Sequence, residues 1–195
     1  QVLKQVPVRF DLKALHVPAY SAETLSSLKE PEQNDFLQQV SSLLESTEKG
    51  TGAARSKLNL LYYLCTVAVH QEIASWLMSS QLFPVLIQQL RVSTSWDVRT
   101  RVAQVIALLA SHTSELGANV PVSEAILLLT EIIRENFRNS KLKQSLLPAL
   151  GELLYLIARE EDKRGHSREC WVVPSTAYTM VMRSLREGVR FFVSS

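Results

Sequence analysis

Apolar residues recur along most of this chain at intervals of three and four, the spacing of a helix that buries one face. Strand-like alternation is almost absent, and the 195 residues include only 6 glycines and 7 prolines. The pattern therefore predicts an all-α protein. The expected helices cover 31–47, a long run after Gly52 that ends near 69, 71–79, 81–92, 96–112, 121–138, 140–160 and a last helix from Pro174 to about 188.

The two ends and one internal stretch depart from this pattern. Residues 1–30 contain two prolines and the polar run SAETLSSLKEPE, which predict an extended lead-in with one short helical turn. The apolar residues of that lead-in are expected to lie along the first helices as a strap, and they are Val8, Phe10, Leu12 and Leu15. The charged run REEDKRGHSRE at 159–169 predicts a solvated linker. The helical region is thus expected to span 31–188, with an irregular tail at 189–195.

An internal repeat is detectable at a shift of 44 residues, which is the difference between 102 and 58. The shift aligns three sets of apolar or amphipathic residues: Leu58, Leu61, Tyr62 and Cys65; Val102, Val105, Ile106 and Leu109; and Leu146, Ala149, Leu150 and Leu153. It also aligns Leu82, Phe83 and Val85 with Ile126, Leu127 and Leu129. The register fails in the first helix and again at the charged linker, which leaves about two regular repeats.

A helical repeat of about 40–47 residues is the period of HEAT and armadillo proteins. The fold class expected from the sequence is therefore a right-handed superhelix of HEAT/armadillo-type repeats. One helical hairpin cannot bury its own apolar stripe, so stacked neighbours must close a continuous core. The curved faces of such arrays bind proteins. Pro148, inside the expected helix 140–160, removes one backbone donor and should kink that helix.

The stretch CWVVPSTAYTMVMRSLREG at 170–188 has two interpretations. In the first, Tyr178, Val181, Met182 and Leu185 form a core stripe against helix 140–160, and Trp171 covers the gap. In the second, the stretch is a docking helix, because methionine-rich faces with arginine suit adaptable partners. The core interpretation is favoured, since a stripe at helical spacing usually belongs to a core.

The tail VRFFVSS adds two large apolar rings beyond that helix and supplies no polar outer face. We therefore expect an exposed apolar patch at this end, where the fragment self-associates or docks another protein. The candidate protein-binding residues are Trp171, Tyr178, Met182, Arg183, Phe191 and Phe192.

Composition excludes several other functions. The formal net charge of +2 gives no concentrated basic field for nucleic acid or an anionic membrane. The longest apolar runs are far too short to span a bilayer. Only two cysteines, Cys65 and Cys170, are present, which indicates a reducing, intracellular and cytoplasmic setting rather than a disulfide scaffold.

No set of residues converges on a catalytic, metal or cofactor site. His166 and Cys170 are four apart, but half of a zinc site without further ligands is most simply a solvated linker. His112 ends an expected helix, where an imidazolium would cap the exposed carbonyl groups. The glycines of GTG at 50–52 do not make a phosphate loop. We therefore expect no cofactor, no nucleotide binding and no enzymatic activity from this chain.

Three stretches are more specific than the fold. They are SKLNLLYYLCTVAVHQE at 56–72, EIIRENFRNSKLKQSLLPALGELLYLIA at 131–158 and CWVVPSTAYTMVMRSLREG at 170–188. They resemble the helical-repeat region that follows the kinase domain in the Unc-51-like kinase family, and most closely its Fused-related pseudokinase branch. The resemblance runs from about residue 7 to 188.

The resemblance implies a parent with an amino-terminal serine/threonine kinase-like domain and a long HEAT/armadillo tail that acts as a scaffold. It also implies links to cilia, microtubule organisation and neuronal development. The glycine-rich loop, H-R-D and D-F-G motifs of a kinase are missing here, so no active-site residue of the family maps onto this chain. Partners are expected to be other proteins, including Fused-type kinases or cytoskeletal proteins. The alternative function is regulation in cis of the parent's kinase-like domain.

Overall fold

A computed structural model describes residues 9–50, 52–164, 171 and 173–186, and this part of the chain is helical without any β-strand. A short 3₁₀ turn, η1, covers Leu12–Ala14. The α-helices are α1 (Ala22–Ser27), α2 (Glu30–Glu45), α3 (Ala53–Ala68), α4 (Gln71–Ser79), α5 (Leu82–Val92), α6 (Trp96–His112), α7 (Val122–Glu135), α8 (Ser140–Arg164) and α9 (Ser175–Arg186). The expected all-α class is confirmed for these residues.

Local sequence signals set several helix ends. The hydroxyl of Ser21 accepts a hydrogen bond from the backbone N–H of Thr24 and caps α1, and Ser95 caps α6 through Val98 in the same way. Pro31 lies in the first turn of α2, where its missing donor costs nothing. After α2, Gly50 takes a φ of 101°, a left-handed conformation that suits glycine in the turn towards α3.

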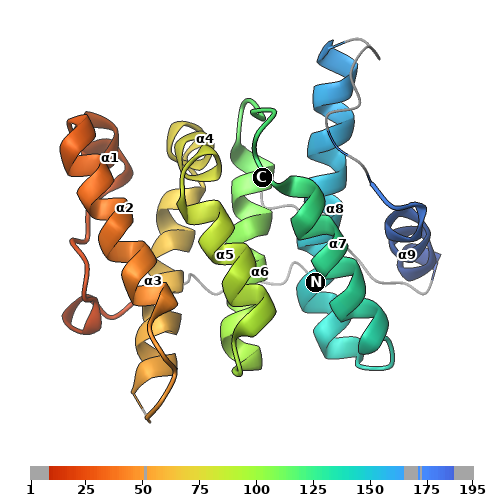
Figure 1. The fold of residues 1–195 in the computed structure, drawn as a ribbon, viewed down its shortest axis with the longest axis horizontal. Helices are drawn as coiled ribbons and strands as arrows, with labels where there is room; N and C mark the ends of the chain where they lie inside the picture. Colours follow the sequence, from red (N-terminus) through yellow and green to blue (C-terminus); the bar gives the residue numbers. More distant parts are fainter. Residues whose placement is uncertain (1–8, 51, 165–170, 172, 187–195) are drawn as a thin grey trace, which may run out of the picture.

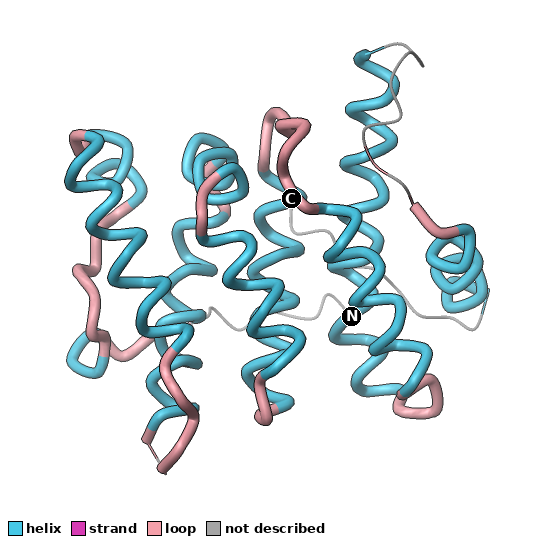
Figure 2. The backbone as a smooth tube through the Cα atoms, viewed as in Figure 1, coloured by secondary structure: helices cyan, strands magenta, loops and turns pink. Residues whose placement is uncertain are grey.

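The helices form two rows, which Figure 1 shows one behind the other. In one row α5 contacts both α2 and α7, and in the other α6 contacts both α3 and α8. Each helix of the first row also contacts the following helix of the second, which gives the pairs α2/α3, α5/α6 and α7/α8. The connections within the three pairs lie along the lower edge of the view in Figure 2, at the ends of the helices.

Burial recurs in α6 and α8 at the expected shift of 44 residues. Val102 and Leu146 are both fully buried, as predicted. The buried residues that correspond are Val98, Val102, Ala103, Val105, Ile106, Leu109 and Ala110 in α6, and Leu142, Leu146, Leu147, Ala149, Leu150, Leu153 and Leu154 in α8. Every member of the second set lies 44 residues after its counterpart in the first.

The shift of 44 is wrong between α3 and α6. Leu58 is only partly buried, and the burial pattern matches at a shift of 42, which places Leu60 opposite Val102. The matching residues of α3 are Leu60, Leu61, Tyr63, Leu64, Val67 and Ala68. The error arose because α3 is apolar on several sides, and apolar letters alone do not reveal which of them face the neighbouring helix.

In the first row, burial also recurs at two different residue intervals, one between α2 and α5 and another between α5 and α7. Phe83 is buried, whereas Leu127, its expected equivalent at 44 residues, is 49% exposed. A shift of 43 instead places every buried residue of α5 on a buried residue of α7, and a shift of 46 relates α2 to α5. The first helix therefore follows the same burial pattern, which the fixed shift of 44 had concealed.

The lead-in contacts the first helices over part of its length. The ring of Phe10 lies 5.3 Å from the ring of Tyr63 in an edge-on arrangement, and the Tyr63 hydroxyl donates a 2.6 Å hydrogen bond to the carbonyl of Tyr20. Leu15 is partly buried, but Leu12 is 64% exposed, so the strap prediction is wrong for Leu12. Val8 lies outside the described residues.

Two helix ends differ from their predictions by three or more residues. Helix α7 ends at Glu135 rather than 138, and the backbone N–H of Asn136 closes it on the carbonyls of Ile132 and Ile133. Helix α8 contains Pro148 and continues to Arg164, so the first part of the expected charged linker is helical. Arg159 and Lys163 in that extension donate hydrogen bonds of 2.8 and 3.1 Å to carbonyls of the α6–α7 loop, which explains the added length.

Candidate protein-interaction surfaces

The α9 helix packs against α7 and α8 through its small side chains and leaves its large apolar side chains in solvent. Ala177 and Ser184 are fully buried, whereas Tyr178, Met182 and Leu185 are 47%, 52% and 45% exposed. The expected core role of these three residues is therefore wrong. Small side chains let one helix approach two others closely, and the larger apolar residues lie on a different side of α9. We call Tyr178, Met182 and Leu185 the α9 stripe.

The rest of the 170–188 stretch matches the core interpretation more closely. Trp171 is only 5% exposed, as expected for a side chain that covers a gap. Met180 is 9% exposed, and Val181 is partly buried against the core. Phe191 and Phe192 lie outside the described residues. Of the candidate binding residues, Tyr178 and Met182 lie on the surface, whereas Trp171 is buried.

Arg183 contributes to the packing of α9 through an aromatic ring. Its guanidinium carbon lies 4.4 Å from the ring centroid of Phe137, and the ammonium nitrogen of Lys143 lies 4.0 Å from the same centroid. Phe137 follows α7, and Lys143 is in the first turns of α8, so one ring joins three elements. Such cation–π contacts are worth about 0.5–2 kcal/mol each. Arg183 therefore orients α9 and with it the α9 stripe.

The α9 stripe begins beside the end of α8. Burial raises the pKa of Tyr178, and the negative charge of Glu161 on α8 raises it further. Arg183 and Arg186 make the last turn of α9 basic. The stripe has the spacing i, i+4 and i+7 of helix-in-groove recognition, with positive charge at one end. Chemically, this surface can bury apolar side chains of another protein.

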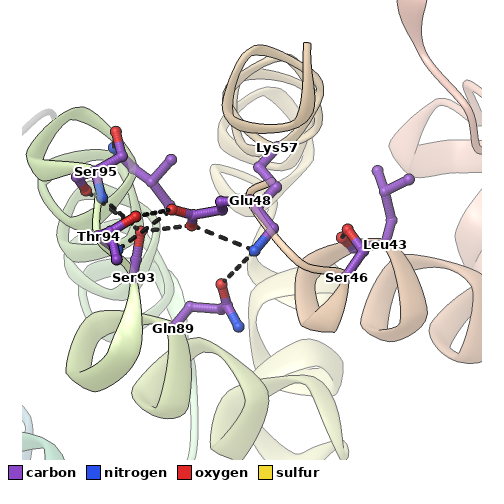
Figure 3. Close-up of polar contacts among 9 residues, drawn as sticks. Leu43, Ser46, Glu48, Lys57, Gln89, Ser93, Thr94 and Ser95 are labelled. Atoms are coloured by element: carbon purple, nitrogen blue, oxygen red, sulfur yellow. Dashed lines mark hydrogen bonds and ion pairs between the residues drawn. The ribbon is translucent and has the colours of Figure 1, made fainter. Parts of the chain in front are cut away.

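A second cluster lies where the α2–α3 loop meets the α5–α6 loop (Figure 3). The ammonium group of buried Lys57 lies 3.3 Å from Glu48 Oε1 and donates a 3.0 Å hydrogen bond to Gln89 Oε1. Ser93 donates a 2.6 Å hydrogen bond to Glu48 Oε1. Thr94 donates to Glu48 Oε2 from its hydroxyl at 3.0 Å and from its backbone N–H at 3.3 Å.

These contacts control the charge of the Glu48 carboxylate. Burial acts to raise its pKa, but the hydrogen bonds from Ser93 and Thr94 and the charge of Lys57 outweigh burial, so the pKa is lowered. A buried lysine that keeps its charge needs such a partner. The cluster therefore joins two neighbouring helix pairs.

The structure tests only part of what the sequence predicted for the histidines. His112 lies in the last turn of α6, as expected. Burial lowers its pKa, and the nearby His70 lowers it further, which disfavours the charged imidazolium of the predicted cap. The Nε2 atom of His112 is buried and has no hydrogen-bond partner among the described residues. His166 and Cys170 lie outside those residues. Within the described part of the chain, no three His, Cys, Asp or Glu side chains are grouped to hold a metal ion.

Cys65 is a buried free thiol in α3. Burial raises its pKa to about 12, against a smaller opposing effect of Arg101. The thiol is therefore protonated at neutral pH and behaves as a small apolar side chain.

An open groove between α2 and α4 was not expected from the sequence. Its walls come from residues 34–38 and 75–81, which are separated by one whole helix, so no local sequence signal indicates it. The exposure of two apolar side chains was also not predicted from the sequence. Leu127 on α7 is 49% exposed, and Tyr155 on α8 is 65% exposed. No helix of the described residues is long and apolar enough to cross a membrane.

Comparison with known proteins gives two informative relatives. The chain is 60% identical over 188 residues, 96% of its length, to the serine/threonine-protein kinase ULK4 of Mus musculus. It is 25% identical over 181 residues to the serine/threonine-protein kinase RUNKEL of Arabidopsis thaliana. The match covers 14% of the first protein and 13% of the second. No protein-family model and no solved structure matches the chain.

The helices and the two relatives together define the class: an all-helical segment of a much larger serine/threonine-protein kinase family protein. Because none of the kinase motifs occurs in it, the segment lies outside the kinase domain. The chain belongs to the Unc-51-like kinase family as a segment of a ULK4-like protein, which confirms the resemblance expected from the sequence.

Proposed function

We propose that this chain is a non-catalytic scaffold segment of HEAT/armadillo type, which binds other proteins. The two rows of helices and the burial pattern that recurs after 42 and 44 residues in the second row support that architecture. The resemblance to the Unc-51-like kinase family supports a setting at the cilium and the microtubule cytoskeleton.

The observation that carries the proposal is the α9 stripe. Three large apolar side chains at helical spacing, each about half exposed, form a surface that a monomeric protein gains nothing by exposing. The contacts of Arg183 and Lys143 with Phe137 fix the helix that presents them. A rigid, apolar, helical surface with basic residues at one end suits an amphipathic helix that carries acidic residues.

The test replaces Met182 by glutamate at the centre of the α9 stripe. The matched control is Leu127→Glu on α7, which changes a leucine of similar exposure on another helix. Wild type and both variants are immobilised in equal amounts, and proteins captured from a ciliated-cell extract are quantified by mass spectrometry. Partners lost from Met182→Glu and kept by Leu127→Glu support the proposal, provided that circular dichroism shows three folded proteins. A capture profile that is identical for all three contradicts it.

The alternative function is regulation in cis of a kinase-like domain. It is motivated by the relative from Mus musculus, which is named as a serine/threonine-protein kinase. The match to this chain covers only 14% of that protein. Calorimetry with the purified kinase-like domain of the parent distinguishes the two functions. Saturable binding that Met182→Glu abolishes would assign the α9 stripe to this intramolecular role, whereas absence of binding leaves the scaffold role.

A further inference from the structure

The two ends of the α9 stripe carry opposite charges. At the end of Tyr178, the carboxylate of Glu161 on α8 lies close enough to raise the pKa of the tyrosine. At the other end, exposed Arg186 follows Leu185 directly in the basic last turn of α9. The surface therefore runs from a negative group through three apolar side chains to a positive group.

Neither of these charges is neutralised within the described part of the chain. The ion pairs among the described residues involve other carboxylates and other bases, and neither Glu161 nor Arg186 takes part in one. The other arginine of the last turn, Arg183, is instead held at the ring of Phe137. Both ends of the stripe can therefore pair with charges of a molecule that docks there.

The stripe is centred on Met182. Tyr178 lies four residues before Met182 and Arg186 lies four residues after it. Each is thus about 6 Å from Met182 along the helix axis, at 1.5 Å per residue. When a second α9 helix runs antiparallel with its Met182 against the first, the Tyr178 of each copy faces the Arg186 of the other. A parallel pair of helices would instead bring the two arginines together.

The antiparallel arrangement places each charge beside an opposite one. The guanidinium group of Arg186 in one copy meets the carboxylate of Glu161 and the ring of Tyr178 in the other, which gives an ion pair and a cation–π contact. The arrangement has two-fold symmetry, so the same contacts form twice. Like charges face each other in the parallel arrangement, which is unfavourable, and the charge pattern therefore selects the antiparallel direction.

We propose that the α9 stripe docks on the α9 stripe of a second copy of this chain, antiparallel and with Met182 at the two-fold axis. The contact is weak, because three half-exposed side chains fall far short of the roughly 800 Å² that each partner buries in a stable interface. Exposed ion pairs add direction more than affinity. The inference rests on the proposed function in its choice of surface, and other proteins that bind the stripe compete with the second copy.

Analytical ultracentrifugation of the folded chain across a concentration series tests the proposal. The test variants are Arg186→Glu and Glu161→Lys, each of which replaces two attractive contacts of the dimer by two repulsive ones. The matched control is Arg55→Glu, which changes an exposed arginine of α3 and alters the net charge as much as Arg186→Glu does. Circular dichroism checks that all of these proteins are folded.

Each test variant is expected to associate about tenfold more weakly than wild type, whereas the control associates as wild type does. Added salt should weaken the wild-type dimer. An equimolar mixture of Arg186→Glu and Glu161→Lys should restore association, because opposite charges again face each other at both sites of the mixed dimer. This recovery is the result that only the antiparallel arrangement with both losses predicts.

The proposal is overturned by a wild-type chain that stays monomeric at the highest concentration, by a test variant that associates as tightly as wild type, or by a mixture that remains monomeric. These outcomes leave the capture experiment with Met182→Glu unaffected, so the scaffold function can hold without self-docking. Conversely, a capture profile that Met182→Glu does not change contradicts the scaffold function and leaves the charge-swap result standing.

Discussion

The ammonium group of Lys57 lies 3.3 Å from the carboxylate of Glu48, with only 4% and 10% of the two side chains exposed. The contact joins the start of α3 to the loop before it, and Ser93 and Thr94 extend it to the next helix pair. A helical array has no strand ladder to lock one unit to the next, so such polar contacts between loops add directional constraint to apolar stacking.

Replacement of Lys57 by methionine is expected to destabilise the chain by about 3 kcal/mol, because the buried carboxylate of Glu48 loses its cation. Urea unfolding followed by circular dichroism measures the change. Combining it with Glu48→Gln should recover part of the loss, since the second change removes the unpaired charge. Purely additive losses in the two single variants and the double variant would contradict a direct coupling.

The Glu48–Lys57 pair also predicts that the free energy of unfolding decreases at acidic pH. The pKa of Glu48 is lowered from its ordinary value of 4.5 in the folded chain, so the unfolded chain binds this proton more readily. The stabilising effect is therefore complete above pH 4.5 and is lost as the pH falls through the lower folded pKa. Unfolding curves of wild type and Glu48→Gln should converge as the pH falls through this range. A constant difference across that range would contradict the assignment.

The corrected repeat register predicts unequal costs at two leucines. Leu146→Ala removes a fully buried side chain and should cost about 2–5 kcal/mol through lost burial and a cavity. Leu58→Ala should cost less than half as much, because Leu58 is only partly buried. Urea unfolding of both variants checks this order. Equal losses would return Leu58 to the buried position that the shift of 44 gives it.

His112 predicts a pH dependence near neutrality. Its pKa is lowered from 6.5 in the folded chain, first by burial and then by His70, so protonation favours the unfolded chain. Stability should therefore be complete above pH 6.5 and fall as the pH drops towards the folded pKa. Thermal unfolding from pH 7.5 to pH 5 should show this loss in wild type and a flatter profile in His112→Asn. NMR titration of His112 provides the direct control, and a pKa above 6.5 would contradict the prediction.

The lead-in is expected to add stability without being needed for folding. Deletion of residues 1–20 removes the Phe10–Tyr63 ring contact and the acceptor of the Tyr63 hydroxyl. Circular dichroism should then show a lower melting temperature and an unchanged helical spectrum. Hydrogen exchange of the intact chain should show protection around residues 10–20. Fast exchange throughout that stretch would mean that the contacts contribute little in solution.

The α9 stripe predicts weak self-association when no partner is present. Three half-exposed side chains are too few for the roughly 800 Å² that each partner buries in a stable interface, so association should appear only at high concentration. Sedimentation across a concentration series should show it for wild type and not for Met182→Arg. Phe191→Ser combined with Phe192→Ser tests the contribution of the tail. A wild-type chain that remains monomeric at every concentration would contradict this prediction.

The sequence by itself determined the class of the fold and most helix boundaries. Its three-and-four spacing of apolar residues places α2 to α9 within a few residues, because a helix must bury one face whatever its neighbours are. The shift of 44 holds between α6 and α8, where Val102 and Leu146 are both fully buried. The family resemblance depended on local strings of residues, which do not require a structure to read.

Tertiary structure decided which apolar residues are core and which are surface. Leu58, Leu127 and Tyr178 have the spacing of buried residues, but the neighbouring helices cover other faces of α3, α7 and α9. Close approach of α9 to α7 and α8 buries Ala177 and Ser184 and leaves Met182 in solvent. The α2–α4 groove and the Glu48–Lys57 cluster also depend on packing, because each joins side chains from separate helices and loops. Whether a side chain is buried depends on the helix that packs against it. The apolar pattern of one helix does not show where that neighbour lies.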